Sequence, residues 1–136
     1  MIYLTDASVL SEVTRPEPDP RVLDWLRRRE RDLVVDPVIL GDLRFGILLM
    51  PNGFRKQQLD RWFDGVVSRV TCLDWETSTG LRWAKLLADL RATGQTMPVK
   101  DSLIAATALA HGLTVVTRQV REFAKAGVPV LDPFQG

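Results

Sequence analysis

The sequence predicts a single α/β domain in which a central parallel β-sheet is flanked by helices. Short apolar segments alternate with longer segments whose apolar residues recur at helical spacing, which is typical of this class. A chain of 136 residues has room for one domain of ordinary size, which we place at residues 1–136. The apolar fraction of 46% is enough to build a core.

The chain is predicted to begin with a strand at residues 2–5, which ends at Asp6. Ser8 can cap a following helix that reaches about Val13. A stiff, extended link is expected next, because proline fixes its own φ. The three prolines of this link are Pro16, Pro18 and Pro20.

The next helix interleaves apolar residues with charges and closes on the basic run Arg27–Arg31. Residues 33–35 form the second predicted strand. Asp36-Pro37 is typical of a helix start, since aspartate caps the helix and proline fits its first turn. We expect this helix to reach Met50, because Pro51-Asn52-Gly53 cannot continue it.

The second half of the chain continues the alternation. Amphipathic helices are predicted at residues 55–67 and 76–91, and an almost wholly apolar helix at 98–111 with Gly112 as its C-cap. A short helix covers residues 120–125. The remaining strands are predicted at residues 70–73, 113–117 and 128–131.

Composition excludes several classes of function. Cys72 is the only cysteine and His111 the only histidine, so an internal disulfide and a Cys/His zinc site are both excluded. A Ser-His-Asp triad would depend on His111, whose place at a helix end favours a structural role. No segment reads as a membrane span or a signal peptide, so we expect a cytoplasmic protein without membrane contacts. Because the net charge is only +1, any binding of nucleic acid must come from a local patch.

The polar residues that follow the predicted strands indicate where a site would lie. In parallel sheets the ligand binds beyond the carboxyl ends of the strands. Asp6 directly follows the first strand, although capping the next helix explains it equally well. Thr117-Arg118-Gln119 follows the fourth predicted strand, and Glu122 comes within one helical turn of it.

Asp101 and Asp42 are poorly explained by their local sequence. Asp101 begins the apolar helix, where complementarity with the helix dipole is worth only about 0.3–1 kcal/mol. Burying a carboxylate costs more than this unless it is paired or bound to a metal, and its neighbour Lys100 points elsewhere on a helix. Asp42 lies in the body of a helix, where aspartate is unfavourable. An ion pair with Arg44 or another surface residue is the alternative explanation for Asp42.

Together these acids suggest a site for a hard cation. Magnesium prefers oxygen ligands, takes one or two protein carboxylates and keeps several waters. Such an ion can activate water and stabilise an in-line phosphoryl displacement, without any histidine or cysteine.

Three segments add a more specific signal: LTDASVLSEVTRP, VILGDLRFGILLMPNG and MPVKDSLIAATALAHGLTVVTRQVREF. In this order and spacing they resemble the PIN-domain ribonucleases of the VapC toxin group, including its FitB-like members. The resemblance implies an α/β/α domain whose acidic pocket holds Mg²⁺ or Mn²⁺ and cleaves RNA endonucleolytically. It also implies a homodimer, and a VapB-type antitoxin whose C-terminal segment blocks the pocket.

The resemblance assigns roles to individual residues. Asp6 and Asp101 match the first and third acids of the family and would be metal ligands, and Asp42 stands where the family usually has a catalytic glutamate. The remaining matched positions carry substitutions for the residues common in the family: Ser8 for asparagine, Gln119 for asparagine or aspartate, and Glu122 for aspartate. Aspartate at position 42 shortens the reach by one methylene group, which a magnesium site tolerates poorly unless a water fills the gap.

Three functions therefore compete. The leading hypothesis is the toxin of a toxin–antitoxin system, a magnesium-dependent endoribonuclease. Its candidates for holding the RNA backbone, each explained equally well as solvated surface, are Arg15, Arg44, Lys100 and Arg118. The alternative is a catalytically weakened PIN module that mainly binds an antitoxin. Phosphoaspartyl chemistry is disfavoured, because a phosphatase of that type needs a second aspartate where this chain has Ser8.

Overall fold

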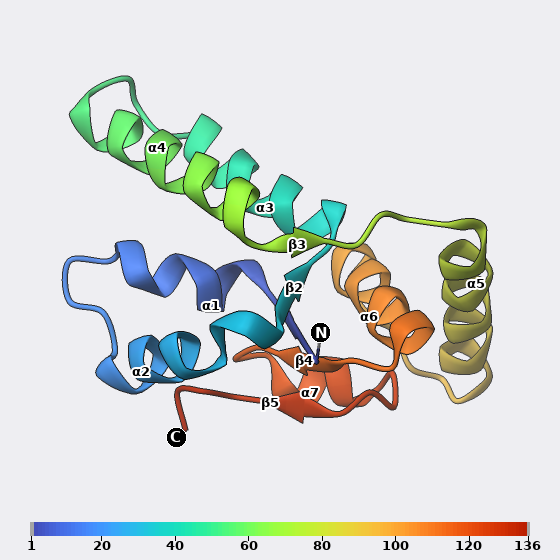
Figure 1. Ribbon diagram of the computed structural model, residues 1–136. Helices are drawn as coiled ribbons and strands as arrows, with labels where there is room; N and C mark the ends of the chain where they lie inside the picture. Colours follow the sequence, from blue (N-terminus) through green and yellow to red (C-terminus); the bar gives the residue numbers. More distant parts are fainter. Residues whose placement is uncertain (1, 136) are drawn as a thin grey trace.

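A computed structural model describes residues 2–135 and shows a five-stranded sheet with helices around it (Figure 1). All four strand pairings are parallel, and the strand order is β3-β2-β1-β4-β5. The strands are β1 (Tyr3–Thr5), β2 (Leu33–Val35), β3 (Thr71–Cys72), β4 (Thr114–Val116) and β5 (Val130–Leu131). The predicted α/β class with a central parallel sheet is confirmed.

The three central strands, β1, β2 and β4, are short and mostly buried. Leu4 in β1 pairs with Val34 in β2 on one side and with Val115 in β4 on the other, and all three side chains are buried. Apolar runs of this kind are expected when helices cover both faces of a parallel sheet. The chain moves outward from β1 to β3 and then returns to β4, so the strand order reverses between β1 and β4. This reversal is where parallel sheets form their ligand crevice.

The helices enclose the sheet and extend beyond it. The α-helices are α1 (Ala7–Ser11), α2 (Pro20–Arg29), α3 (Pro37–Leu48), α4 (Phe54–Arg69), α5 (Thr77–Ala92), α6 (Val99–His111) and α7 (Val120–Ala124), with 3-10 turns at Glu12–Thr14 and Glu30–Asp32. Helices α3 and α4 form a projecting hairpin, and α5 packs along α6 at the other end of the molecule (Figure 1). Within residues 2–135, no helix has the length and apolar character needed to cross a membrane.

Two predicted helix starts are wrong by a residue or more. Helix α1 begins at Ala7 and is capped by Asp6, whose Oδ1 accepts the Val9 N–H at 3.0 Å, so Ser8 is not the cap. Pro20, expected in the extended link, is the first residue of α2 and follows a capping aspartate. Both helix starts have the same cause. An aspartate in extended backbone caps the helix, and the residue after it is suited to the first turn.

Strand limits also differ slightly from the prediction. β5 begins at Val130 instead of residue 128, and β3 spans only Thr71–Cys72. The first helix ends its α-helical part at Ser11 and continues as the 3-10 turn to Thr14.

Asp36 connects two helices at the carboxyl edge of the sheet. It is completely buried, and its Oδ1 accepts the Ile39 N–H at 2.9 Å at the start of α3. Its Oδ2 accepts the hydroxyl of Thr107 on α6 at 2.7 Å. Burial raises the pKa of Asp36, and hydrogen bonds from Thr107 and Ile39, with smaller contributions from Trp75 and Val38, oppose that rise. This carboxylate therefore has partners on both oxygens and a structural role.

The Asp36–Thr107 contact gives a stability prediction. Thr107→Val removes the hydroxyl but keeps the side-chain shape, and leaves one oxygen of a buried carboxylate without its partner. We expect a loss of about 1–3 kcal/mol in the free energy of unfolding, measured by urea denaturation. Thr107→Ser keeps the hydroxyl and should lose less. Equal stability of the valine variant and the parent would show that this contact does not hold α3 to α6.

Candidate metal site

The predicted site residues gather at the reversal point of the sheet. Asp6 directly follows β1, and its backbone N–H donates to the carbonyl of Val116 in the neighbouring β4 at 3.0 Å. Thr117 and Gln119 follow β4, and Asp101 lies in the first turn of α6. The topology thus places the first and third acids of the predicted set at the same edge.

Asp6 is held in a fixed orientation by its neighbours. Its carboxylate is 8% exposed, and its Oδ1 accepts both the Val9 N–H and the hydroxyl of Ser8, the latter at 2.9 Å. The Thr117 side chain also hydrogen-bonds to this carboxylate. Burial raises the pKa of Asp6 despite these three bonds, and the negative charge of Asp42 raises it further. Asp6 is therefore both the helix cap and an oriented acid facing other acids.

Asp101 is buried without hydrogen bonds. The residue is only 6% exposed, yet within residues 2–135 no hydrogen bond to its carboxylate contributes to its pKa. Burial raises the pKa of Asp101 most, and the negative charges of Glu122, Asp6 and Asp42 add to the rise, while Lys100 opposes it. A buried carboxylate of this kind destabilises a fold unless a cation compensates it. Asp101 contrasts with Asp36, which has a partner on each oxygen.

Asp42 forms an ion pair that the sequence did not identify. Its Oδ2 lies 3.1 Å from the Nζ of Lys100, across the gap between α3 and α6. The alternative of an ion pair with another surface residue is thus confirmed, whereas the pair with Arg44 is not, because Arg44 pairs with Asp60 on α4. The Asp42 carboxylate still acts on Asp6 and Asp101 through its charge. It stands at the rim of the acidic cluster, with its charge partly compensated.

The remaining predicted acid, Glu122, is also paired. Its Oε1 lies 3.0 Å from the Nζ of Lys125 one turn further along the chain. Gln119 precedes α7, and its backbone N–H donates to the Thr117 hydroxyl at 3.0 Å. Both residues lie on the same side of the sheet as Asp101, and the charge of Glu122 reaches it.

The four candidates for RNA contacts differ in their surroundings. Arg44 is engaged by Asp60 and lies over the Phe63 ring, and Arg15 pairs with Glu12 at 3.6 Å. Lys100 borders the acidic cluster. Arg118 follows β4 and lies over the ring of Phe134. Only Lys100 and Arg118 of these four are therefore placed beside the predicted site.

The donor set suits a hard cation. The acidic side chains are close enough to raise one another's pKa, and carboxylate oxygens are the ligands that Mg²⁺ prefers. Within residues 2–135, no three acidic, histidine or cysteine side chains converge as a complete ligand cage. That arrangement is consistent with an ion held by two carboxylates and otherwise by water. Asp6 and Asp101 are the two residues whose burial and surroundings fit this role.

Two features of the site were missed by sequence reasoning. The Thr117 hydroxyl contacts Asp6, and Lys125 neutralises Glu122. The sequence placed Thr117 at this edge of the sheet, but its contact with Asp6 depends on the pairing of β1 with β4. Lys125 lies three residues after Glu122 on a short helix, a spacing at which ion pairs commonly form.

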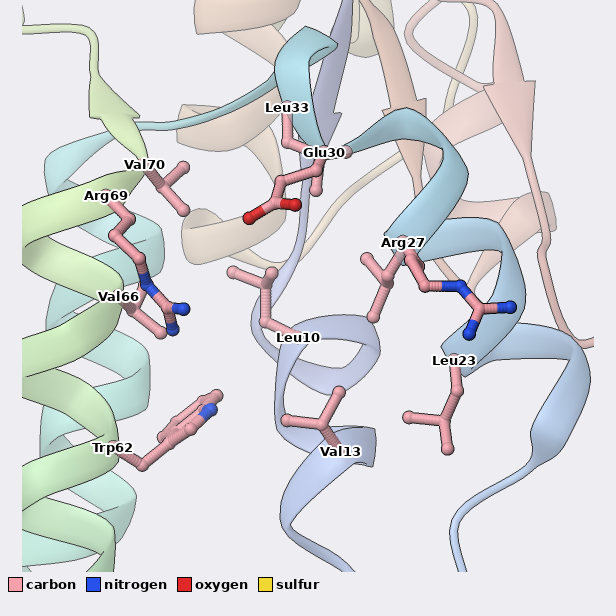
Figure 2. A pocket seen from close by; sticks show the side chains of 11 residues that line it. Leu10, Val13, Leu23, Arg27, Glu30, Leu33, Trp62, Val66, Arg69 and Val70 are labelled. Carbon is pink, nitrogen blue, oxygen red and sulfur yellow. The ribbon is translucent and has the colours of Figure 1, made fainter.

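An apolar groove lies between α1, α2 and α4. Its volume is about 270 Å³, and Trp62 and Val66 on α4 face Leu10 and Val13 across it (Figure 2). Arg27, Arg69 and Glu30 stand among its lining residues (Figure 2). A second cavity of about 320 Å³ also contains Trp62 and extends to Asp42 and Ser8. Trp62 lines both cavities, and the second one also reaches two residues of the predicted site.

Comparison with known sequences agrees with this geometry. The PIN domain family pattern matches residues 3–128. The plasmid stability protein StbB of Pseudomonas syringae pv. tomato is 36% identical over 98% of this chain and 99% of its own length. The VapC ribonuclease Y4jK of Sinorhizobium fredii is 34% identical over 99% of both chains, and toxin FitB of Neisseria gonorrhoeae is 30% identical over 98% of this chain and 99% of its own.

Solved structures agree as well. FitAcB from Neisseria gonorrhoeae matches with a TM-score of 0.89 at 29% identity, covering 99% of this chain and 100% of that chain. FitAB bound to an IR36 DNA fragment matches with the same TM-score and identity, covering 98% and 96%. The resemblance inferred from three sequence segments is confirmed. With its fold, its acidic edge and relatives matched from end to end, this chain belongs to the PIN domain family, in the group of the VapC and FitB toxins.

Proposed function

We propose that this chain, residues 1–136, is the toxin of a toxin–antitoxin system and acts in the cytoplasm as a magnesium-dependent endoribonuclease. The observation that carries the proposal is the buried Asp101 carboxylate, which lacks a hydrogen-bond donor beside the oriented Asp6. Relatives called VapC ribonuclease and toxin FitB support the class of activity. Mn²⁺ is expected to substitute for Mg²⁺, because both accept oxygen ligands.

Asp6 and Asp101 would hold the ion. When bound, Mg²⁺ activates water and stabilises the charge that develops on the phosphate. The Asp6 carboxylate is kept in place by Ser8, Val9 and Thr117, which preorganises one side of the site. Lys100 supplies a positive charge at the rim, where the RNA backbone would approach.

The groove and its neighbouring cavity suggest where an antitoxin binds. Its apolar lining with charged residues at the edge fits an amphipathic helix, the common ligand of such grooves. The second cavity has both Trp62 and Asp42 in its lining, so a segment that continued from the helix around Trp62 would reach the acidic cluster. We therefore place the VapB-type partner in the groove, with its end over the site.

A homodimer is the second assembly we propose. Exposed apolar side chains gather at the turn between α3 and α4, where few neighbours cover them: Phe45, Leu48, Leu49 and Phe54. Contiguous exposed apolar surface of this kind is typical of an interaction site. We assign this turn to the contact between two copies of the chain.

A catalytically weakened module is the second candidate function. It is favoured by two ion pairs, Asp42–Lys100 and Glu122–Lys125, which occupy the carboxylates at two substituted positions. Metal-dependent cleavage of total RNA by the pure chain separates the two functions, with Asp101→Asn as the control. Cleavage by the parent alone supports the nuclease. Absence of cleavage by both, with antitoxin binding intact, supports the weakened module.

The acidic cluster predicts how stability depends on pH without metal. The pKa values of Asp6 and Asp101 are raised above the ordinary 3.8, so their ionised forms destabilise the folded chain. In chelator at neutral pH, Asp6→Asn and Asp101→Asn should be as stable as the parent or more stable. Asparagine also caps helices well, so α1 keeps its start. The gain should vanish below pH 3.8, where both folded and unfolded carboxylates are protonated, as measured by urea denaturation across pH.

The same variants test metal binding. Ligands that bind only the native state raise its stability, so millimolar Mg²⁺ or Mn²⁺ should raise the Tm of the parent. Each asparagine variant should show a smaller shift. If both keep the full metal-induced shift, Asp6 and Asp101 are not the ligands.

Two substitutions of Asp42 should have different effects on the rate of RNA cleavage. Asp42→Ala should abolish metal-dependent RNA cleavage, and Asp42→Glu should preserve or raise it, because the usual glutamate reaches one methylene group further. Positioning errors of about 1 Å can cost on the order of 100-fold in rate. Folding should barely change in either variant, since the Asp42 side chain is 29% exposed. Equal cleavage by the parent and Asp42→Ala would remove Asp42 from the mechanism.

Two charge substitutions separate the antitoxin surface from the dimer surface. Val13→Arg places a charge in the groove at an exposed position, and Leu49→Arg does the same at the α3–α4 turn. With a VapB-type antitoxin co-expressed, Val13→Arg should lose co-purification of that partner and stay dimeric in sedimentation. Leu49→Arg should keep the partner, and the Leu49→Arg chain purified without antitoxin should sediment as a 15.3 kDa species. If Val13→Arg instead abolishes the dimer and Leu49→Arg loses the antitoxin, the two surfaces have the opposite roles.

A further inference from the structure

Arg118 is held in a fixed position by an aromatic ring. Its Cζ lies 3.9 Å from the centroid of the Phe134 ring, at the distance of close cation–π contact. Phe134 is only 5% exposed, and its backbone N–H donates to Asp132 Oδ1 at 2.9 Å, so the ring is anchored by packing and by its own turn. Arg118 itself remains exposed. One face of the guanidinium is thus supported while the side chain still reaches solvent.

Arg118 also lines a cavity of about 520 Å³. Phe134 is not among the residues that line this cavity. Gln119 and Gln135 contribute amide groups to the lining, and Glu122 stands at the border with the acidic cluster. Arg118 and Gln119 follow β4, whose Val116 carbonyl accepts the Asp6 N–H, so the cavity lies at the same edge of the sheet as the candidate metal site.

The lining favours a base over a phosphate. The carboxylates of Asp132 and Glu122 offset the positive charges of Arg118 and Arg121, so the cavity has no excess charge to attract an anion. Arginine planes stack on unpaired bases, and side-chain amides hydrogen-bond to base edges. A guanidinium already ordered on a ring loses little conformational entropy when a base stacks on it.

We propose that Arg118, supported by Phe134, is the stacking platform for one unpaired base of the RNA, next to the phosphate that is cleaved. The inference rests on the proposed ribonuclease function and adds a base subsite to it. In this role Arg118 reads the flat face of a base, whereas Lys100 on the other side of the acidic cluster meets the backbone.

The test measures binding without cleavage. The chain carrying Asp101→Asn, in chelator, is titrated against a short single-stranded RNA and against versions in which one nucleotide at a time is abasic, by fluorescence anisotropy. We expect one abasic position to weaken binding about tenfold, as base stacking commonly does. Adding Arg118→Lys should weaken binding of the intact RNA by a similar factor and abolish the difference between intact and abasic RNA. The salt dependence should stay the same, because the charge is kept.

Arg121→Lys is the matched control, since Arg121 lines the same cavity without lying on the ring. It should leave the abasic effect intact. The inference is overturned if no abasic position weakens binding, or if Arg118→Lys keeps the full effect. Cleavage of the intact RNA by the parent chain with Mg²⁺ is measured in parallel. Cleavage without an abasic effect overturns the stacking site alone, whereas an abasic effect without cleavage supports the stacking site and contradicts the nuclease.

Discussion

The fold and the site both depend on the carboxylates at the carboxyl edge of a short parallel sheet. Asp6 and Asp36 follow adjacent strands, and both cap the helix that comes next. Both carboxylate oxygens of Asp36 accept hydrogen bonds inside the protein. The Asp6 carboxylate accepts three hydrogen bonds, and none from residues 2–135 is found for the Asp101 carboxylate. The number of internal partners therefore separates a structural acid from an acid that needs a cation.

Much of this arrangement could be predicted from local sequence. The alternation of apolar strands with helices, the Asp36-Pro37 start and the Gly112 cap depend on contacts within a few residues, and the structure confirms all three. For α1 the local sequence offers two capping residues, Asp6 and Ser8. Asp6 is the cap in the structure, because it stands in extended backbone directly after β1.

The remaining contacts join residues far apart in the chain, and no local pattern encodes them. Lys100 meets Asp42 across 58 residues, and Thr107 meets Asp36 across 71. Arg118 was predicted as a backbone contact, but its place over Phe134 depends on how the last turn returns to the end of β4. Contacts of this kind can be predicted only once the fold is known, because the fold decides which side chains come together and how deeply each is buried.

Two ion pairs with lysine offset part of the negative charge of the acidic cluster. An acidic site must keep several carboxylates ionised and close together, which costs stability when no cation is bound. Lys100 and Lys125 pair with Asp42 and Glu122 at the rim, where solvent still screens the pairs, whereas neither Asp6 nor Asp101 forms an ion pair within residues 2–135. The repulsion between carboxylates therefore acts most on these two buried acids, and a divalent ion bound by them, as proposed above, would relieve it.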